Sequence, residues 1–149
     1  MGSRNFDKEG VKTDTLKLVE QGVLKHYLID TYNGKKLNLK SNGRFGGTSN
    51  LYFENGNISF KDLLNSKSKS LYITETIGHG SNIVTGDYSV GATGFLVENG
   101  EFKYPINEIT IAGNFKDMFQ HITLANDLEF KYATNSPTMM IEGMVVAGK

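Results

Sequence analysis

The sequence predicts a mainly β (α+β) fold, an antiparallel β-barrel or curled β-sandwich with two or three short helices packed at its ends. Glycine is frequent, with 17 residues, whereas proline is scarce, with 2. The glycines fall between short β-rich runs, which is typical of turns in an antiparallel β protein. Closure into a barrel or sandwich would protect strand edges that the pattern otherwise leaves open.

Two hairpins are the clearest local signals. Residues 13–20 begin with alternating polar and apolar side chains, Gln21-Gly22 supplies a tight turn, and residues 23–30 return. Gly22 can take a positive φ without steric cost. The second hairpin joins residues 94–98 to residues 101–104 through Asn99-Gly100, because Asn-Gly is the preferred pair for a type I′ turn.

Short helices are expected at three places. Residues 31–39 are expected to form a helical turn, and Ser59 is expected to cap a helix over residues 60–65. Asn114 is expected to cap a third helix over residues 115–122, because Phe115, Met118, Phe119 and Ile122 follow i, i+3, i+4, i+7 spacing and so share one face. Further strands are predicted at residues 50–54, 70–77, 108–112, 128–132, 138–142 and 144–147.

The composition limits the class of protein. A chain of 149 residues fits one domain over residues 1–149, and no linker or internal repeat divides it. No apolar run is long enough to cross a bilayer and no signal peptide is visible, so a cytoplasmic protein without membrane contact is expected. The first residues carry no helix or strand signal, so the chain is expected to be a fragment of a longer protein.

The charge balance argues against a nucleic-acid-binding protein. Sixteen basic and sixteen acidic side chains cancel, whereas binding to phosphates needs a basic face. Lys35, Lys36, Lys40 and Arg44 form either a local basic patch or, as we prefer, a solvated turn region. The absence of cysteine excludes disulfides, thiolate metal ligands and a cysteine nucleophile.

The histidines do not predict a metal site. His26, His79 and His121 never stand three or four residues apart on one element, and zinc needs three or four protein ligands. The glycine-rich segment 78–91 is not a phosphate-binding P-loop, because Asp87 follows Gly86 where lysine would be needed. It is expected to be a loop that needs positive φ and close backbone approach.

Several segments resemble the TldD/PmbA family, whose members were once called modulators of DNA gyrase. The resemblance covers nearly the whole chain and is most specific in its middle, where the motifs G-D-[FY]-S, E-N-G-x-[IF]-x-Y-P and T-I-A-G-N follow in order. The last of these makes the chain more similar to the PmbA (TldE) branch than to the TldD branch. The segments that carry the resemblance are residues 2–11, 18–32, 49–56, 76–89, 91–95, 98–100, 104–106, 108–114, 117–118, 126–129 and 136–149.

The resemblance implies the C-terminal domain of a two-domain protein, preceded by an α/β half. In the TldD branch that half carries an HExxxH helix, and a cysteine from the C-terminal domain completes the zinc site. That cysteine is expected in the stretch 132–136, and this chain has none. The resemblance therefore implies a chain without metal, catalytic residue or cofactor of its own, with the zinc held by a metal-bearing subunit.

The partners implied are a TldD-type subunit, or a second copy in a homodimer, and an unfolded peptide, which can add to an exposed strand edge. Two alternatives stay open. The full-length chain could be a zinc metallopeptidase with a substitute for the cysteine, or it could be a regulator of DNA gyrase.

The residues expected to line a peptide-binding groove are His79, Thr85, Gly86, Asp87, Tyr88 and Ser89. No base adjoins Ser89 in the sequence, so Ser89 is not expected to be a nucleophile.

Overall fold

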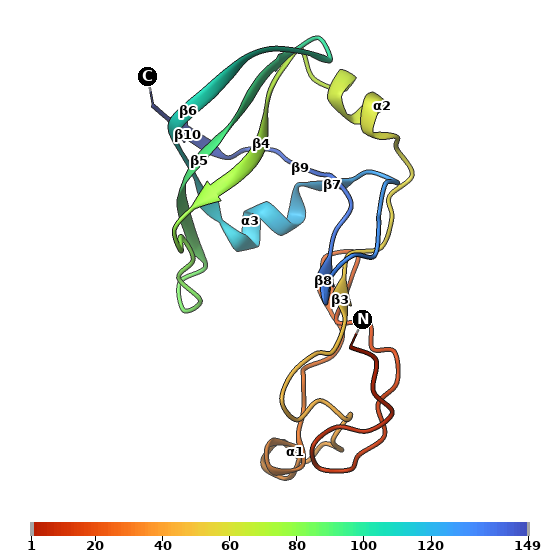
Figure 1. Ribbon diagram of the computed structural model, residues 1–149. Helices are drawn as coiled ribbons and strands as arrows, with labels where there is room; N and C mark the ends of the chain where they lie inside the picture. Colours follow the sequence, from red (N-terminus) through yellow and green to blue (C-terminus); the bar gives the residue numbers. More distant parts are fainter. Residues whose placement is uncertain (1, 149) are drawn as a thin grey trace. The chain divides into compact units, whose positions relative to one another are not determined.

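The computed structural model describes residues 2–148, and within them the protein is mainly β with three short helices (Figure 1). This confirms a mainly β fold with short helices, whereas the antiparallel barrel or curled sandwich stays a prediction. Contacts divide the chain into two compact units. Unit 1 comprises Met1–Phe53 and Glu129–Asn135, and unit 2 comprises Glu54–Leu128 and Ser136–Lys149. The single domain expected over residues 1–149 stays a prediction.

Unit 2 is built on a four-stranded sheet in the order β10-β6-β5-β4, with every neighbouring pair antiparallel. Its strands are β4 (Lys69–Ile77), β5 (Asp87–Glu98), β6 (Glu101–Asn114) and β10 (Val145–Ala147). The Asn99-Gly100 hairpin is confirmed, because φ is 51° at Asn99 and 77° at Gly100, as a type I′ turn requires. Both strands are longer than predicted, and β6 takes in the predicted strand at residues 108–112.

The core of unit 2 lies on one face of this sheet. Val90 and Ala92 of β5 pack with Ile109 and Ile111 of β6, and all four are buried. The spacing of two residues on each strand puts these side chains on the same face. Burial of such apolar area supplies most of the free energy that holds the sheet together.

The three helices begin where the sequence predicts. Asp30, Ser59 and Asn114 are the N-caps, and the side chain of each accepts a hydrogen bond from a backbone amide of the first turn. The helices are α1 (Thr31–Leu37), α2 (Phe60–Asn65) and α3 (Phe115–Gln120). The prediction that α3 continues to residue 122 is wrong, because Ile122 already belongs to a strand.

The short strands differ most from the prediction. β7 (Ile122–Leu124), which was not expected, pairs antiparallel with β9 (Met139–Ile141). β3 (Leu51–Tyr52) pairs with β8 (Thr134–Asn135) in parallel, an exception to the antiparallel pattern.

The strand predicted at residues 128–132 is wrong. The Asn135 side chain bonds this backbone instead: Oδ1 accepts from the amides of Lys131 and Tyr132, both at 2.9 Å, and Nδ2 donates to Tyr132 O at 2.7 Å. Such side-chain bonds to the backbone compete with a strand ladder.

Unit 1 contains the other hairpin, β1 (Val19–Glu20) and β2 (Val23–Leu24). Its turn is confirmed, with φ of 49° at Gln21 and 75° at Gly22. The paired strands are much shorter than predicted. All four of their residues are exposed, so no buried face stabilises a longer pairing of the two strands.

Asp7 is the polar centre of unit 1. Its Oδ1 accepts from the amides of Glu9 at 2.9 Å and Val11 at 3.0 Å, and its Oδ2 accepts from Phe45 N at 3.0 Å. Burial acts to raise the pKa of Asp7, but these three amides and the Arg4 charge outweigh it and hold the pKa below its ordinary value of 3.8. No helix of residues 2–148 is long and apolar enough to span a bilayer.

Candidate functional site

The candidate site is the loop 78–86 together with the first residues of β5. The Asn82 side chain shapes this loop, because its Oδ1 accepts from Val84 N at 3.0 Å and from Thr85 N at 3.2 Å. Backbone bonds then close the loop from Gly86 N to Asn82 O and from Asn82 N to Asp87 O, both 2.8 Å. The loop is therefore held by its own hydrogen bonds and presents its tip in a fixed conformation.

Glycine is required at two positions of the loop for different reasons. Gly86 has φ of +83°, a region that side chains other than glycine rarely adopt. At Gly80 an added Cβ would lie 2.2 Å from Ser89 O, while Ser89 N donates to Gly80 O at 2.8 Å. The expected positive φ and close backbone approach are both present.

A hydrogen-bond network joins the end of the loop to the end of β6. Thr85 Oγ1 donates to Asp87 Oδ2 at 2.7 Å, and Asn114 Nδ2 lies 3.0 Å from Asp87 Oδ1 and 3.2 Å from Thr85 O. Asn114 Oδ1 meanwhile accepts from Lys116 N at 3.1 Å. Sequence reasoning identified Asn114 only as a helix cap and missed that it also fixes Asp87.

Two irregularities in the β5–β6 pairing bring Asp87 and Asn114 together. From the turn, Glu98 pairs with Glu101, so an uninterrupted register would put Asp87 opposite Ala112. Leu96 faces two residues of β6, and Thr93 faces two more, so the register shifts twice by one residue. Asp87 is consequently paired with Asn114. Neither hydrophobic alternation nor turn residues mark these bulges in the sequence, although Glu108 in the second has a φ of 55°.

The network holds the Asp87 carboxyl in its ionised form. The hydrogen bonds from Thr85 and Asn114 lower the pKa of Asp87 below its ordinary value of 3.8, against a smaller opposing effect of burial. A lowered pKa in the folded state stabilises the fold fully above the unfolded value, and this contribution is lost as the pH falls through the folded value.

Asp87→Asn is therefore expected to lower the melting temperature at pH 7. The difference from the unmutated protein is expected to shrink below about pH 4 and to disappear once Asp87 is protonated. Thermal unfolding between pH 7 and pH 3 measures this difference. A difference in melting temperature that stays constant across this pH range would contradict the assigned network.

Thr85→Val removes one hydrogen-bond donor to Asp87. In this variant, NMR titration is expected to show a pKa of Asp87 closer to 3.8.

The predicted site residues are only partly brought together. Thr85, Gly86 and Asp87 belong to the network, and Gly86 O accepts from Phe115 N at 2.8 Å. Tyr88 instead packs on Phe115, with ring centroids 5.5 Å apart. His79 and Ser89 are exposed, and no hydrogen bond is found from either side chain to the network within the described residues.

The loop tip carries a feature that sequence reasoning missed. Ile83 is 92% exposed and Val84 is 89% exposed, the two most exposed large apolar residues of the described chain. Phe115 also stacks on Phe119, at 5.8 Å between ring centroids, and Phe119 is half exposed. The apolar tip thus directly precedes Thr85 in the chain, and the stacked rings begin at Phe115, directly after Asn114.

The residues present do not fit a zinc site. Among residues 2–148, no three His, Asp or Glu side chains gather in a group that could hold a metal ion. The Nδ1 of His26 lies 2.8 Å from Lys17 O, and the Nδ1 of His121 lies 2.8 Å from Asp117 O, so each of these rings is engaged with its local backbone.

Comparisons with known proteins agree with the resemblance in the sequence. The model of the PmbA/TldA metallopeptidase C-terminal domain matches residues 1–148. The chain is 45% identical to a metalloprotease PmbA homolog of Buchnera aphidicola, over 99% of this chain and 34% of the relative. It is 41% identical to metalloprotease PmbA of Escherichia coli O157:H7, over 100% of this chain and 33% of the relative. The chain thus spans about a third of the length of these relatives.

Solved structures give the same assignment. A proposed modulator of DNA gyrase from Thermotoga maritima superposes with a TM-score of 0.90 at 36% identity, over 98% of this chain and 36% of that chain. TldE from Thermococcus kodakarensis superposes with a TM-score of 0.77 at 25% identity, over 97% of this chain and 36% of that chain. The chain belongs to the PmbA/TldD metallopeptidase family, and it matches the C-terminal domain of that family.

Proposed function

We propose that residues 1–149 are the C-terminal domain of a PmbA/TldE-like subunit in a zinc-dependent protease complex that degrades or trims flexible peptides. The observation that carries this proposal is the similarity of almost the whole chain to PmbA proteins and to TldE. The scattered histidines and the lack of cysteine support assigning the zinc to another subunit, of the TldD type. Within this proposal the complex works in the cytoplasm.

The role of this domain is to bind the partner subunit and to help hold an extended peptide. Asp87 and Thr85 would contact the peptide backbone or its polar groups, with Tyr88, Gly86, Ser89 and His79 completing the groove. The rigid loop supports this role, because side chains fixed by hydrogen bonds lose little entropy on binding. An extended peptide can also add to a strand at the edge of a sheet, and β4 lies at such an edge.

The proposal includes a more closed β structure in the complete protein. The four-stranded sheet has β4 and β10 at its two edges. Strands from the remaining polypeptide or from the partner would continue it into the expected barrel or curled sandwich. Covering the edges in this way would remove the hazard of edge-to-edge aggregation.

Zinc analysis and peptide hydrolysis test the proposal. The full-length protein, purified alone, is expected to contain far less than one zinc per chain and to leave casein uncleaved. Mixed with a TldD-type subunit, it is expected to form a complex with about one zinc per pair of subunits, the content of one catalytic site, and to cleave casein. Metal analysis and a casein digestion assay measure both quantities.

The TldD-type subunit alone serves as the control, since it should bind zinc whether or not this protein is present. One zinc per chain together with casein cleavage by this protein alone would overturn the proposal. That outcome would favour the alternative in which the full-length chain is itself a zinc metallopeptidase.

A role at DNA gyrase is the second candidate function. It is favoured by the similarity to the proposed gyrase modulator of Thermotoga maritima and by an excess of basic residues in unit 1, which has ten Lys and Arg against six Asp and Glu. If the protein contacts DNA, binding to a duplex should weaken steeply with salt as counterions are released. Absence of measurable binding at low salt would remove a role at gyrase that works through DNA contact.

A further inference from the structure

Unit 1 has almost no apolar core of its own. Of the buried hydrophobic residues in the described chain, only Ile29 lies in unit 1, and the other nine lie in unit 2. In contrast, 15 of the large exposed apolar residues lie in unit 1. This is the reverse of a free-standing domain, in which burial of apolar side chains provides the driving force for folding.

Polar side chains, rather than packing, fix the backbone of unit 1. Asp7 and Asn135 are each 7% exposed, and each accepts or donates three hydrogen bonds with the backbone. Asn42 does the same for the segment before α1, because its Oδ1 accepts from Ile29 N at 3.0 Å and its Nδ2 donates to Tyr27 O at 2.8 Å. The apolar side chains are thereby held outward on a preformed backbone.

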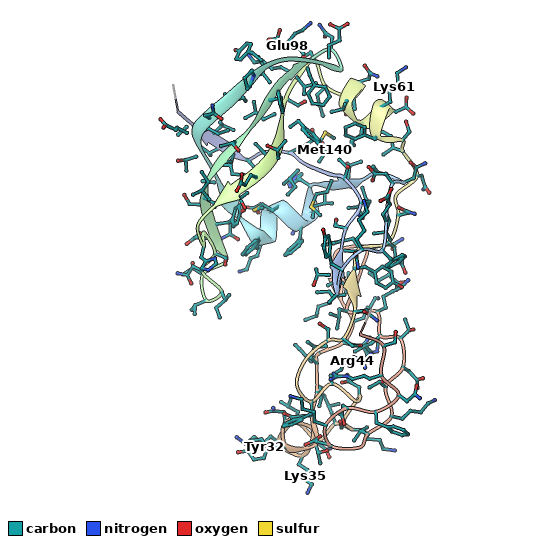
Figure 2. The ribbon with its side chains drawn as sticks, viewed as in Figure 1. Tyr32, Lys35, Arg44, Lys61, Glu98 and Met140 are labelled. Carbon is teal, nitrogen blue, oxygen red and sulfur yellow. The ribbon has the colours of Figure 1, made fainter. Side chains whose placement is uncertain are left out.

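Some of these apolar side chains lie on the hairpin, on α1 or in the segment between them, and we call this set the hairpin–helix surface. Paired residues of a hairpin share a face, so Val19 and Leu24 point to the same side. Figure 2 shows the Tyr32 and Lys35 side chains of α1 projecting away from the rest of unit 1. The surface is defined by Val19, Leu24, Tyr27, Tyr32 and Leu37, which are 54–64% exposed. Large apolar side chains that are more than half exposed are candidates for burial against another polypeptide.

We infer that the hairpin–helix surface packs against the polypeptide that precedes residue 1 in the full-length protein. This chain matches a C-terminal domain and only about a third of the length of its relatives. Residues 2 and 3 belong to unit 1, and Asn50 anchors them: Gly2 N donates to Asn50 Oδ1 and Asn50 Nδ2 donates to Ser3 Oγ, both at 3.1 Å.

Two properties favour this occupant over a separate molecule. A covalently attached segment acts at an effective concentration of roughly millimolar, far above that of a free partner. Unit 1 also carries the excess of basic residues described above, so the covering segment is expected to have acidic residues around an apolar centre. The inference needs only the family assignment, and it is independent of the proposed zinc chemistry.

Photo-crosslinking in the full-length protein tests the inference. p-Benzoyl-phenylalanine replaces Tyr32 in one variant and Tyr27 in another. Each substitution exchanges one aromatic side chain for another. The control carries it at Lys61, an exposed residue of α2. On irradiation, both test positions are expected to crosslink within one chain to peptides from before residue 1, with about tenfold the yield of the control, because a covered side chain touches several residues.

The crosslink yield is also expected to be unchanged when the protein is diluted. Crosslinks between two chains, or to a TldD-type subunit, would overturn the inference and identify a different occupant. Crosslinks to residues 54–128 would overturn it by assigning the cover to unit 2, and yields equal to the Lys61 control would overturn it by leaving the surface uncovered. None of these results depends on zinc content or casein cleavage, so failure here is distinct from failure of the proposed function.

Discussion

Gly94→Ala is expected to destabilise the sheet of unit 2 by about 3 kcal/mol or more, at the upper end of the range for overpacking a core. A Cβ at this position would lie 2.0 Å from Tyr72 O and 2.9 Å from Ile73 Cα. Both atoms belong to the backbone of β4, so no side-chain rotation can make room. The strands would have to separate where β4 and β5 pair, next to the buried core.

Hydrogen exchange of the full-length protein measures this effect, because it reports the free energy of opening for β4 and β5 separately from the rest of the chain. Gly91→Ala is the matched control on the same strand. Its Cβ would lie 3.6 Å from Ile77 Cβ, an ordinary contact, so it is expected to be neutral or to stabilise by about 0.4–1 kcal/mol. Equal exchange rates in the two variants would show that β4 does not approach Gly94 as described.

Gly80→Ala is expected to release the loop of the candidate site while leaving the sheet intact. The added Cβ would lie 2.2 Å from Ser89 O and 2.8 Å from Val90 Cβ. The bond from Ser89 N to Gly80 O would break, at a local cost of about 1–3 kcal/mol. The pairing of Asp87 with Asn114 should persist, because it belongs to the β5–β6 ladder.

Amide exchange in residues 81–86 is expected to rise by roughly tenfold to a hundredfold, as 1.4 kcal/mol corresponds to a factor of ten. Exchange in β6 should stay unchanged. Within the proposed function, casein cleavage by the complex should fall, because the groove is no longer preformed. Ser81→Ala is the control, since it trims an exposed side chain of the same loop. Unaltered exchange in Gly80→Ala would argue against the close approach of the loop to β5.

Local signals in the sequence determined the starts of the helices and both tight turns. Asp30, Ser59 and Asn114 cap helices because a short polar side chain can bond an amide two or three residues away, which needs no tertiary contact. Gln21-Gly22 and Asn99-Gly100 make turns because their backbone tolerates positive φ. The family assignment likewise followed from motifs in the sequence and was confirmed.

Features that depend on distant partners were decided by the tertiary structure. The stretch at residues 128–132 has strand composition, but the buried Asn135 side chain takes its amides into a turn. β7 forms because β9 is available 17 residues later, and α3 ends early for the same reason. Strand pairing is a contact between segments far apart in the chain, so neither composition nor periodicity specifies it.

The candidate site shows the same division within a few residues. The sequence by itself determined the loop, its glycines and the cap at Asn114, because these depend on local backbone conformation. The tertiary structure decided which residue faces Asp87. Two bulges move the register of β6 by two residues, and they replace Ala112 with Asn114 as the partner that hydrogen-bonds the carboxylate. A bulge opposes two residues of one strand to one residue of its neighbour, so it is a property of the paired strands and not of either strand alone.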